Sequence, residues 1–177
     1  MQKTIILLFF FILIGNYAFA CKCQNKDDIK LDYANTEVVV RAKVLNKEFV
    51  TFSSTLDGKG LNLVCKAYQN DTEKLDFLEK DWILKTELEI IDTYKGNGLS
   101  KKIVVYTSRL SASCGYLNFE IGKEFQIYLS STCYFHFMFK KAQLNPENYT
   151  HYWTSRCSRT KEFDLTEDRI LKSLMDK

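Results

Sequence analysis

Six cysteines carry the most specific chemistry in this sequence of 177 residues. Two of them form the motif Cys21-Lys22-Cys23. The other four are Cys65, Cys114, Cys133 and Cys157. Cysteine thiolates bind zinc, whereas cysteine pairs form disulfides in oxidising compartments. Because a Cys-x-Cys spacing fits either chemistry, the compartment of the protein decides between them.

The first twenty residues predict export. A positive start, Met1-Gln2-Lys3, precedes an apolar run over residues 5–14, and Ala18-Phe19-Ala20 places small residues where a signal peptidase reads. The apolar run is shorter than the roughly 20 residues that span a bilayer, so a signal peptide is favoured over an uncleaved anchor. We therefore expect a signal peptide over residues 1–20 and one domain over residues 21–177. In a secreted or periplasmic chain the cysteines predict disulfides.

Sequence motifs of common catalytic sites are missing. Neither His136 nor His151 belongs to a His-Glu-x-x-His pattern, and the sequence has no Gly-x-Ser-x-Gly and no glycine-rich phosphate loop. The formal net charge of +3 gives no basic field that argues for nucleic acid. Aromatic residues and lysines over residues 134–141 superficially fit a single-strand-binding groove, but alternating aromatics in a strand are more often core. We therefore expect that the protein is not an enzyme, that it binds no cofactor and no metal of its own, and that it has no nucleic-acid partner.

The elements that position these residues are mainly strands. Period-2 alternation and short apolar runs predict strands over residues 36–45, 61–68, 82–94, 103–106 and 124–129, and residues 133–140 continue or pair with the last. We expect a turn at residues 57–60, a polar connection over residues 69–80 and a short helix over residues 27–33. A capping box at residues 164–167 and apolar residues at helical spacing predict a C-terminal amphipathic helix packed on the sheet. The pattern alone leaves a small barrel and a sandwich both open.

An ordered set of short motifs resembles a known family. The set comprises Cys21-Lys22-Cys23, Val38-Val39-Val40-Arg41-Ala42-Lys43-Val44, Tyr94-Lys95-Gly96, Tyr106-Thr107, Ser113-Cys114-Gly115, Gly122-Lys123-Glu124-Phe125 and Cys157-Ser158-Arg159-Thr160. It resembles the N-terminal domain of the tissue inhibitors of metalloproteinases, within the wider netrin-like module family. The resemblance implies a closed five-stranded OB-type barrel with disulfides Cys21–Cys114 and Cys23–Cys157. We expect a third bridge between Cys65 and Cys133, although the animal inhibitors have their third pair elsewhere.

The resemblance also implies a mode of inhibition. In the family, the α-amine and carbonyl of the N-terminal cysteine chelate the catalytic zinc of a metalloproteinase, a role that here falls to Cys21. Lys22 would enter the specificity pocket of the protease, where animal inhibitors usually carry Thr or Ser, and an unpaired ammonium in an apolar pocket is costly. The protease contact would also include Cys23 and the loop residues Ser111, Ala112 and Ser113. We expect a secreted monomer whose partner is a zinc metalloproteinase.

Two alternatives stay open. A netrin-like module can serve as an extracellular or envelope interaction module without inhibiting a protease. In a bacterium, a cysteine that follows a small residue at the end of a signal sequence is a lipoprotein site; Ala20 fits that pattern and Phe19 does not. Lipidation of Cys21 would exclude both its disulfide with Cys114 and zinc chelation, so the two assignments are mutually exclusive.

Overall fold

The computed structural model describes residue 23 and residues 28–110 and 113–175. The expected signal peptide over residues 1–20, together with Cys21, Lys22, Ser111 and Ala112, lies outside the described residues. Within the described part of the chain, no helix is both long and apolar enough to cross a bilayer.

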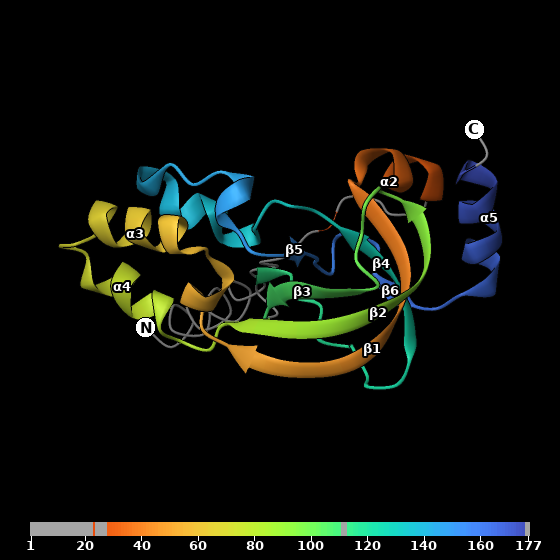
Figure 1. Cartoon of the computed structure of the whole chain (residues 1–177), viewed down its shortest axis with the longest axis horizontal. Helices are drawn as coiled ribbons and strands as arrows, with labels where there is room; N and C mark the ends of the chain where they lie inside the picture. The colour runs from red at the N-terminus through yellow and green to blue at the C-terminus, as the bar shows by residue number, and fades with distance from the viewer. Residues whose placement is uncertain (1–22, 24–27, 111–112, 176–177) are drawn as a thin grey trace, which may run out of the picture.

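A six-stranded sheet curls into a half-barrel (Figure 1). Its strand order is β5-β3-β2-β1-β4-β6. The strands are β1 (Val38–Val50), β2 (Ile83–Lys95), β3 (Lys102–Ser108), β4 (Glu124–Leu129), β5 (Tyr152–Trp153) and β6 (Lys161–Glu162). All pairings are antiparallel except β3 with β5, and an isolated bridge between Ser130 and Trp153 joins the end of β4 to β5. The expected mainly β class is confirmed, and the sheet contains six strands where the resemblance implied five.

The long strands follow from the patterns that predicted them. Strand β1 begins with Val38, Val39 and Val40, all buried, because it is paired on both sides and covered on both faces. Its pairing with β2 shifts register three times between Val39 and Asn46, and such bulges increase local twist. The curl of the sheet follows from this twist. Side chains of these strands, together with Phe119, form an apolar cluster that includes Leu88, Val105, Phe125 and Ile127.

Two helices replace the strand and the polar connection expected between β1 and β2. Helix α3 (Gly58–Ala67) occupies most of residues 61–68, so the strand predicted there is wrong, and helix α4 (Thr72–Leu78) occupies the connection. The Asp57 side chain caps α3 by accepting a hydrogen bond from Gly60 N at 2.5 Å, and Asp71 caps α4 through Lys74 N at 3.1 Å. The expected turn at residues 57–60 is the capped start of α3.

The aromatic segment after β4 is also helical. Residues 134–142 form the 3-10 segment η3 (Tyr134–Ala142), so the strand expected over residues 133–140 is wrong. The short turns η1 (Ser53–Thr55) and η4 (Pro146–Asn148) lie in the segments before α3 and after η3. Together these helices bury an aromatic cluster around Phe52 at one end of the sheet (Figure 1).

Helices α2 (Ile29–Asn35) and α5 (Leu165–Met175) lie at the other end of the sheet, as Figure 1 shows. They confirm the two helices predicted from the sequence, and the Asp164 side chain accepts a hydrogen bond from Glu167 N at 2.9 Å as a capping residue. The Glu167 side chain, however, lies in a buried polar network rather than reaching back to the helix start.

Candidate functional site at the cysteine-bonded edge

A disulfide joins Cys23 to Cys157. Their Cα atoms lie 5.1 Å apart, and 134 positions separate them in the sequence. The pairing that the resemblance implied is therefore confirmed. In the chain-entropy model, closing a loop of this length stabilises the folded state by about 4–5 kcal/mol. The covalent bond holds Cys23 at the turn that carries Cys157, between the edge strands β5 and β6.

A second disulfide-bonded cysteine, Cys114, lies beside this bond. The Cys114 carbonyl accepts a hydrogen bond of 2.7 Å from the backbone N–H of Arg156, the residue before Cys157. Cys114 has a φ of 56°, in the left-handed region, and the next residue is Gly115. A Cβ on Gly115 would lie 1.8 Å from the Ser108 carbonyl oxygen, so the loop approaches the end of β3 as closely as glycine alone allows.

Two of the six residues predicted to contact a protease are therefore placed at this edge. Cys23 is bonded to Cys157, and Ser113 lies next to Cys114, with its N–H donating to the Leu110 carbonyl at 3.0 Å. The other four, Cys21, Lys22, Ser111 and Ala112, lie outside the described residues. The hydrogen bond between Arg156 and Cys114 brings the loop and the Cys157 turn together.

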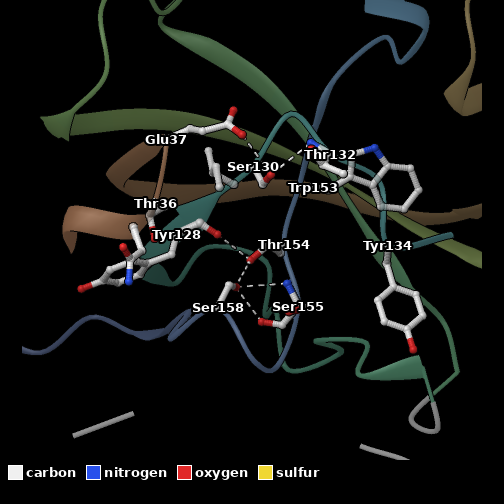
Figure 2. A pocket seen from close by; sticks show the side chains of 12 residues that line it. Thr36, Glu37, Tyr128, Ser130, Thr132, Tyr134, Trp153, Thr154, Ser155 and Ser158 are labelled. Carbon is white, nitrogen blue, oxygen red and sulfur yellow. Dashed lines mark hydrogen bonds between the residues drawn. The ribbon is translucent and has the colours of Figure 1, made fainter. Parts of the chain in front are cut away.

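Hydroxyl groups hold the turn that carries Cys157 (Figure 2). Ser155 Oγ accepts a hydrogen bond from Cys157 N at 3.1 Å, and Ser158 Oγ donates to the Ser155 carbonyl at 2.7 Å. Thr154 Oγ1 donates to the Tyr128 carbonyl at 2.9 Å and so fastens the turn to β4. Sequence reasoning missed this network, although the density of Ser and Thr over residues 154–160 was the available signal.

A groove with a volume of about 230 Å³ opens beside the turn (Figure 2). The Glu37 carboxylate lies on its wall and accepts hydrogen bonds from Ser130 Oγ at 3.2 Å and from Ser131 N at 2.9 Å. Tyr134, a partly exposed aromatic side chain, lines its other side. The remaining lining residues are Asn35, Thr36, Tyr128, Leu129, Thr132, Trp153, Thr154, Ser155 and Ser158.

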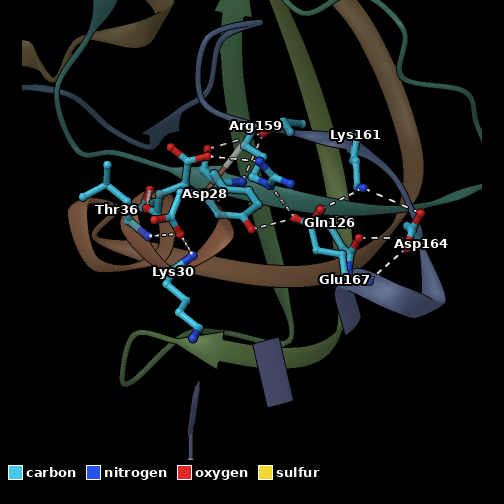
Figure 3. A network of polar contacts seen from close by, with 12 residues as sticks. Asp28, Lys30, Thr36, Gln126, Arg159, Lys161, Asp164 and Glu167 are labelled. Atoms are coloured by element: carbon cyan, nitrogen blue, oxygen red, sulfur yellow. Dashed lines mark hydrogen bonds and ion pairs between the residues drawn. The ribbon is translucent and has the colours of Figure 1, made fainter. Parts of the chain in front are cut away.

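A buried polar network lies behind the turn (Figure 3). Glu167 is 2% exposed, and its Oε1 accepts from Tyr128 OH at 2.7 Å and from Arg159 Nε at 3.1 Å, while its Oε2 lies 2.8 Å from Lys161 Nζ. Burial opposes the charged carboxylate, but these three donors together hold the pKa of Glu167 below its ordinary value. Arg159 Nη1 also lies 3.3 Å from Asp32 Oδ2 in α2. The network thus joins β4, α5 and α2.

The third predicted bridge does not form. Cys65 and Cys133 are both free thiols. Cys65 lies on the exposed side of α3, next to buried Val64, whereas Cys133 is 2% exposed and its sulfur accepts a hydrogen bond from Phe135 N at 3.2 Å. Helix α3 exposes Cys65 to solvent while Cys133 is buried, so the two thiols lie in different environments. Burial raises the pKa of the Cys133 thiol, which makes it an unreactive core residue.

The two histidines lie in aromatic surroundings. His136 Nδ1 lies 3.3 Å from Tyr149 OH, and the His151 ring packs on Tyr106 with ring centroids 5.5 Å apart. Burial, assisted by nearby Lys85, lowers the pKa of His151. Over the described ranges, no group of three or more His, Cys, Asp and Glu side chains could hold a metal ion.

Comparison with known proteins adds no assignment, because neither a family model nor a curated protein matches the chain. The candidate site therefore rests on its own geometry and on the motif resemblance.

Proposed function

We propose that this protein is an exported inhibitor of zinc metalloproteinases that acts through its own N-terminus at Cys21. The supporting observation is the bonded edge: the Cys23–Cys157 disulfide lies beside disulfide-bonded Cys114, with Arg156 N donating to Cys114 O. Two residues after the proposed terminus, the chain is thus covalently fastened. Because the disulfide already restrains the terminus, less conformational entropy is lost on binding than with a flexible terminus.

The proposed chemistry needs an unblocked amine. A catalytic zinc keeps one position for water, and an amine with a pKa near 8 loses its proton readily enough to replace that water. Cys23 and Cys157 are bonded to each other and Cys65 and Cys133 are free, which leaves Cys21 as the partner we assign to disulfide-bonded Cys114. A sulfur used in that bond could not carry a lipid, so the proposal excludes a lipoprotein anchor.

We further propose that the half-barrel is a closed OB-type barrel in solution. The order β5-β3-β2-β1-β4 and the bridge between Ser130 and Trp153 support this assignment, because that bridge connects the two ends of the five-strand set. Strand β6 would then be an addition at the edge of β4.

The experiment compares three purified proteins against a panel of metalloproteinase catalytic domains. One begins at Cys21, and a second carries one additional alanine before Cys21; a third, with one alanine added after Lys177, is the matched control. The extension should raise the inhibition constant at least about 100-fold, because it moves the amine away from the zinc. Equal inhibition by all three proteins would contradict chelation by the N-terminus.

Lys22 provides a second test of the same proposal. Lys22→Thr should strengthen inhibition of proteases with apolar specificity pockets, since it removes an ammonium that must lose water on entry. Proteases with acidic pockets should instead prefer the unsubstituted protein. No difference between the two proteins on either class would mean that Lys22 does not enter the pocket.

A non-inhibitory interaction module is the second candidate. Tyr134 is 37% exposed and Phe137 is 55% exposed, and these two aromatic side chains pack edge to face on η3 beside the groove. They belong to no part of the inhibitory edge. Retention of a partner by the one-residue extension, but not by Phe137→Ser, would favour this second function.

A further inference from the structure

Arg159 connects the disulfide-bonded turn to the first helix. It lies two residues after Cys157, and Asp32, with which it forms an ion pair of 3.3 Å, lies nine residues after Cys23. The disulfide, the turn and the ion pair therefore form a ring that includes α2.

The backbone at Arg159 is unusual for a residue with a long side chain. Its φ is 60°, in the left-handed region that favours glycine. That side chain is 15% exposed and points into the polar network of Figure 3, where Glu167 Oε1 lies 3.1 Å from its Nε. Glu167 Oε1, which also accepts a hydrogen bond from Tyr128 OH, fixes the direction of the guanidinium.

We propose that Arg159 is a positioning residue for the inhibitory edge, holding α2 in a fixed relation to the Cys23–Cys157 disulfide. This inference rests on the proposed function for its consequence, namely that loss of the ion pair weakens inhibition. The positioning itself is a property of the folded chain and is measurable without a protease. Helix α5 then contributes to the proposed site indirectly, because its Glu167 orients Arg159.

Two variants remove the ion pair in different ways. Asp32→Asn removes the carboxylate and leaves Arg159, Glu167 and the Asp28 cap of α2 in place. Arg159→Gly removes the guanidinium and keeps a residue suited to a φ of 60°. Lys161→Met is the matched control, because Lys161 also contacts Glu167 but has no contact with α2 among those described. Arg159→Lys tests whether one charge suffices without the planar fork.

Hydrogen exchange of the α2 amides is the first readout. Asp32→Asn and Arg159→Gly should each accelerate it about 10-fold, and the double variant should add little beyond the larger single effect, because both remove the same contact. Lys161→Met should stay within about 2-fold of the unsubstituted protein, and Arg159→Lys should restore only part of the protection. Unchanged exchange in Asp32→Asn, or equal acceleration in Lys161→Met, would overturn the positioning role.

Inhibition is the second readout, and it separates the two claims. Asp32→Asn should raise the inhibition constant about 10-fold while the thermal midpoint shifts by only a few degrees. An unchanged inhibition constant with accelerated α2 exchange would overturn the consequence for the site. Failure of the unsubstituted protein to inhibit any protease would refute the proposed function, and the exchange result would still decide whether Arg159 positions α2.

Discussion

The two ends of the sheet are stabilised by different interactions (Figure 1). At the end covered by α3, α4 and η3, the Phe52 ring stacks on Phe139 at 5.0 Å and meets Phe77 and Phe135 at 5.6 and 5.8 Å. At the end covered by α2 and α5, two carboxylates, Glu167 and Asp168, are buried with charged and phenolic partners.

The two ends therefore differ in the perturbations that they resist. Aromatic packing depends on filled volume and is insensitive to protonation. The stabilising contribution of a buried carboxylate depends on its hydrogen-bond donors and cationic partners, and protonation of the carboxylate removes that contribution. Arg159 connects the proposed inhibitory edge to the polar end, so solution conditions that protonate the carboxylates should also affect the proposed site. Changes in the aromatic end should affect mainly global stability.

The largest expected effect is at the aromatic end. Phe52→Ala should lower the free energy of unfolding by about 4 kcal/mol, because it leaves a cavity among four aromatic side chains. Denaturant unfolding measures the change, with Phe137→Ala, at a 55% exposed position, expected within about 0.5 kcal/mol of the unsubstituted protein. A loss below about 1 kcal/mol in Phe52→Ala would show that this end adapts to the cavity.

At the polar end, Glu167→Gln should lower the free energy of unfolding by about 2–3 kcal/mol, since the amide leaves Arg159 and Lys161 without their shared carboxylate. Glu162→Gln, at an exposed carboxylate, is the matched control and should cost less than about 1 kcal/mol. Equal effects in the two variants would mean that burial of Glu167 adds nothing to its ion pairs.

Acid should distinguish the two ends. The pKa values of Glu167 and Asp168 are lowered in the folded protein by their hydrogen-bond donors, in spite of burial. Their stabilising contribution is therefore complete above the unfolded pKa values of about 4 and is lost as pH falls through the lower folded values. Stability measured from pH 7 down to pH 3 should decline less steeply in Glu167→Gln than in the unsubstituted protein. Phe52→Ala should keep the original pH slope.

A smaller effect is expected at Tyr94. Its hydroxyl donates to Asp168 Oδ1 at 2.5 Å, and burial followed by this bond raises the pKa of Tyr94. Tyr94→Phe should cost about 1–2 kcal/mol in the free energy of unfolding, because a buried carboxylate loses one donor and keeps Lys172. The same substitution at Tyr134, which is exposed, should leave unfolding unchanged within about 0.5 kcal/mol.

The smallest effect is expected at Cys65. Cys65→Ser should change the free energy of unfolding by less than about 0.5 kcal/mol, because the thiol is exposed and unpaired. Titration with a thiol reagent should detect Cys65 in the folded protein and both Cys65 and Cys133 after unfolding. A folded protein without a reactive thiol would revive the third bridge.

The strands could be predicted because apolar and polar residues alternate along them with the two-residue period of a β-strand. Strand β2 repeats apolar and charged residues over most of its length, and a helix would scatter that pattern around its surface. Residues 61–68 were ambiguous: Leu61, Leu63 and Cys65 alternate as in a strand, while Leu61, Val64 and Tyr68 have helical spacing. Tertiary packing of α3 on η3 decided between the two patterns.

The candidate site could be predicted only in part. Motif order implied the bond between Cys23 and Cys157, which the structure confirms. The absence of a bond between Cys65 and Cys133 could not be predicted, because it depends on Cys65 lying on the exposed side of α3 and the sequence pattern had predicted a strand there. The role of Arg159 depends on a left-handed backbone and on partners in two helices, neither of which a local pattern contains.

The decisive measurement is the intact mass of the mature protein purified from its natural source, before and after reduction. The proposed function predicts a chain that begins at unmodified Cys21 and gains about 4 Da on reduction, corresponding to two disulfides and two free thiols. It would be contradicted by an acyl chain or any other group on Cys21, by a chain that begins elsewhere, or by a gain of about 2 Da, each of which leaves the zinc without its proposed ligand or without a fastened terminus.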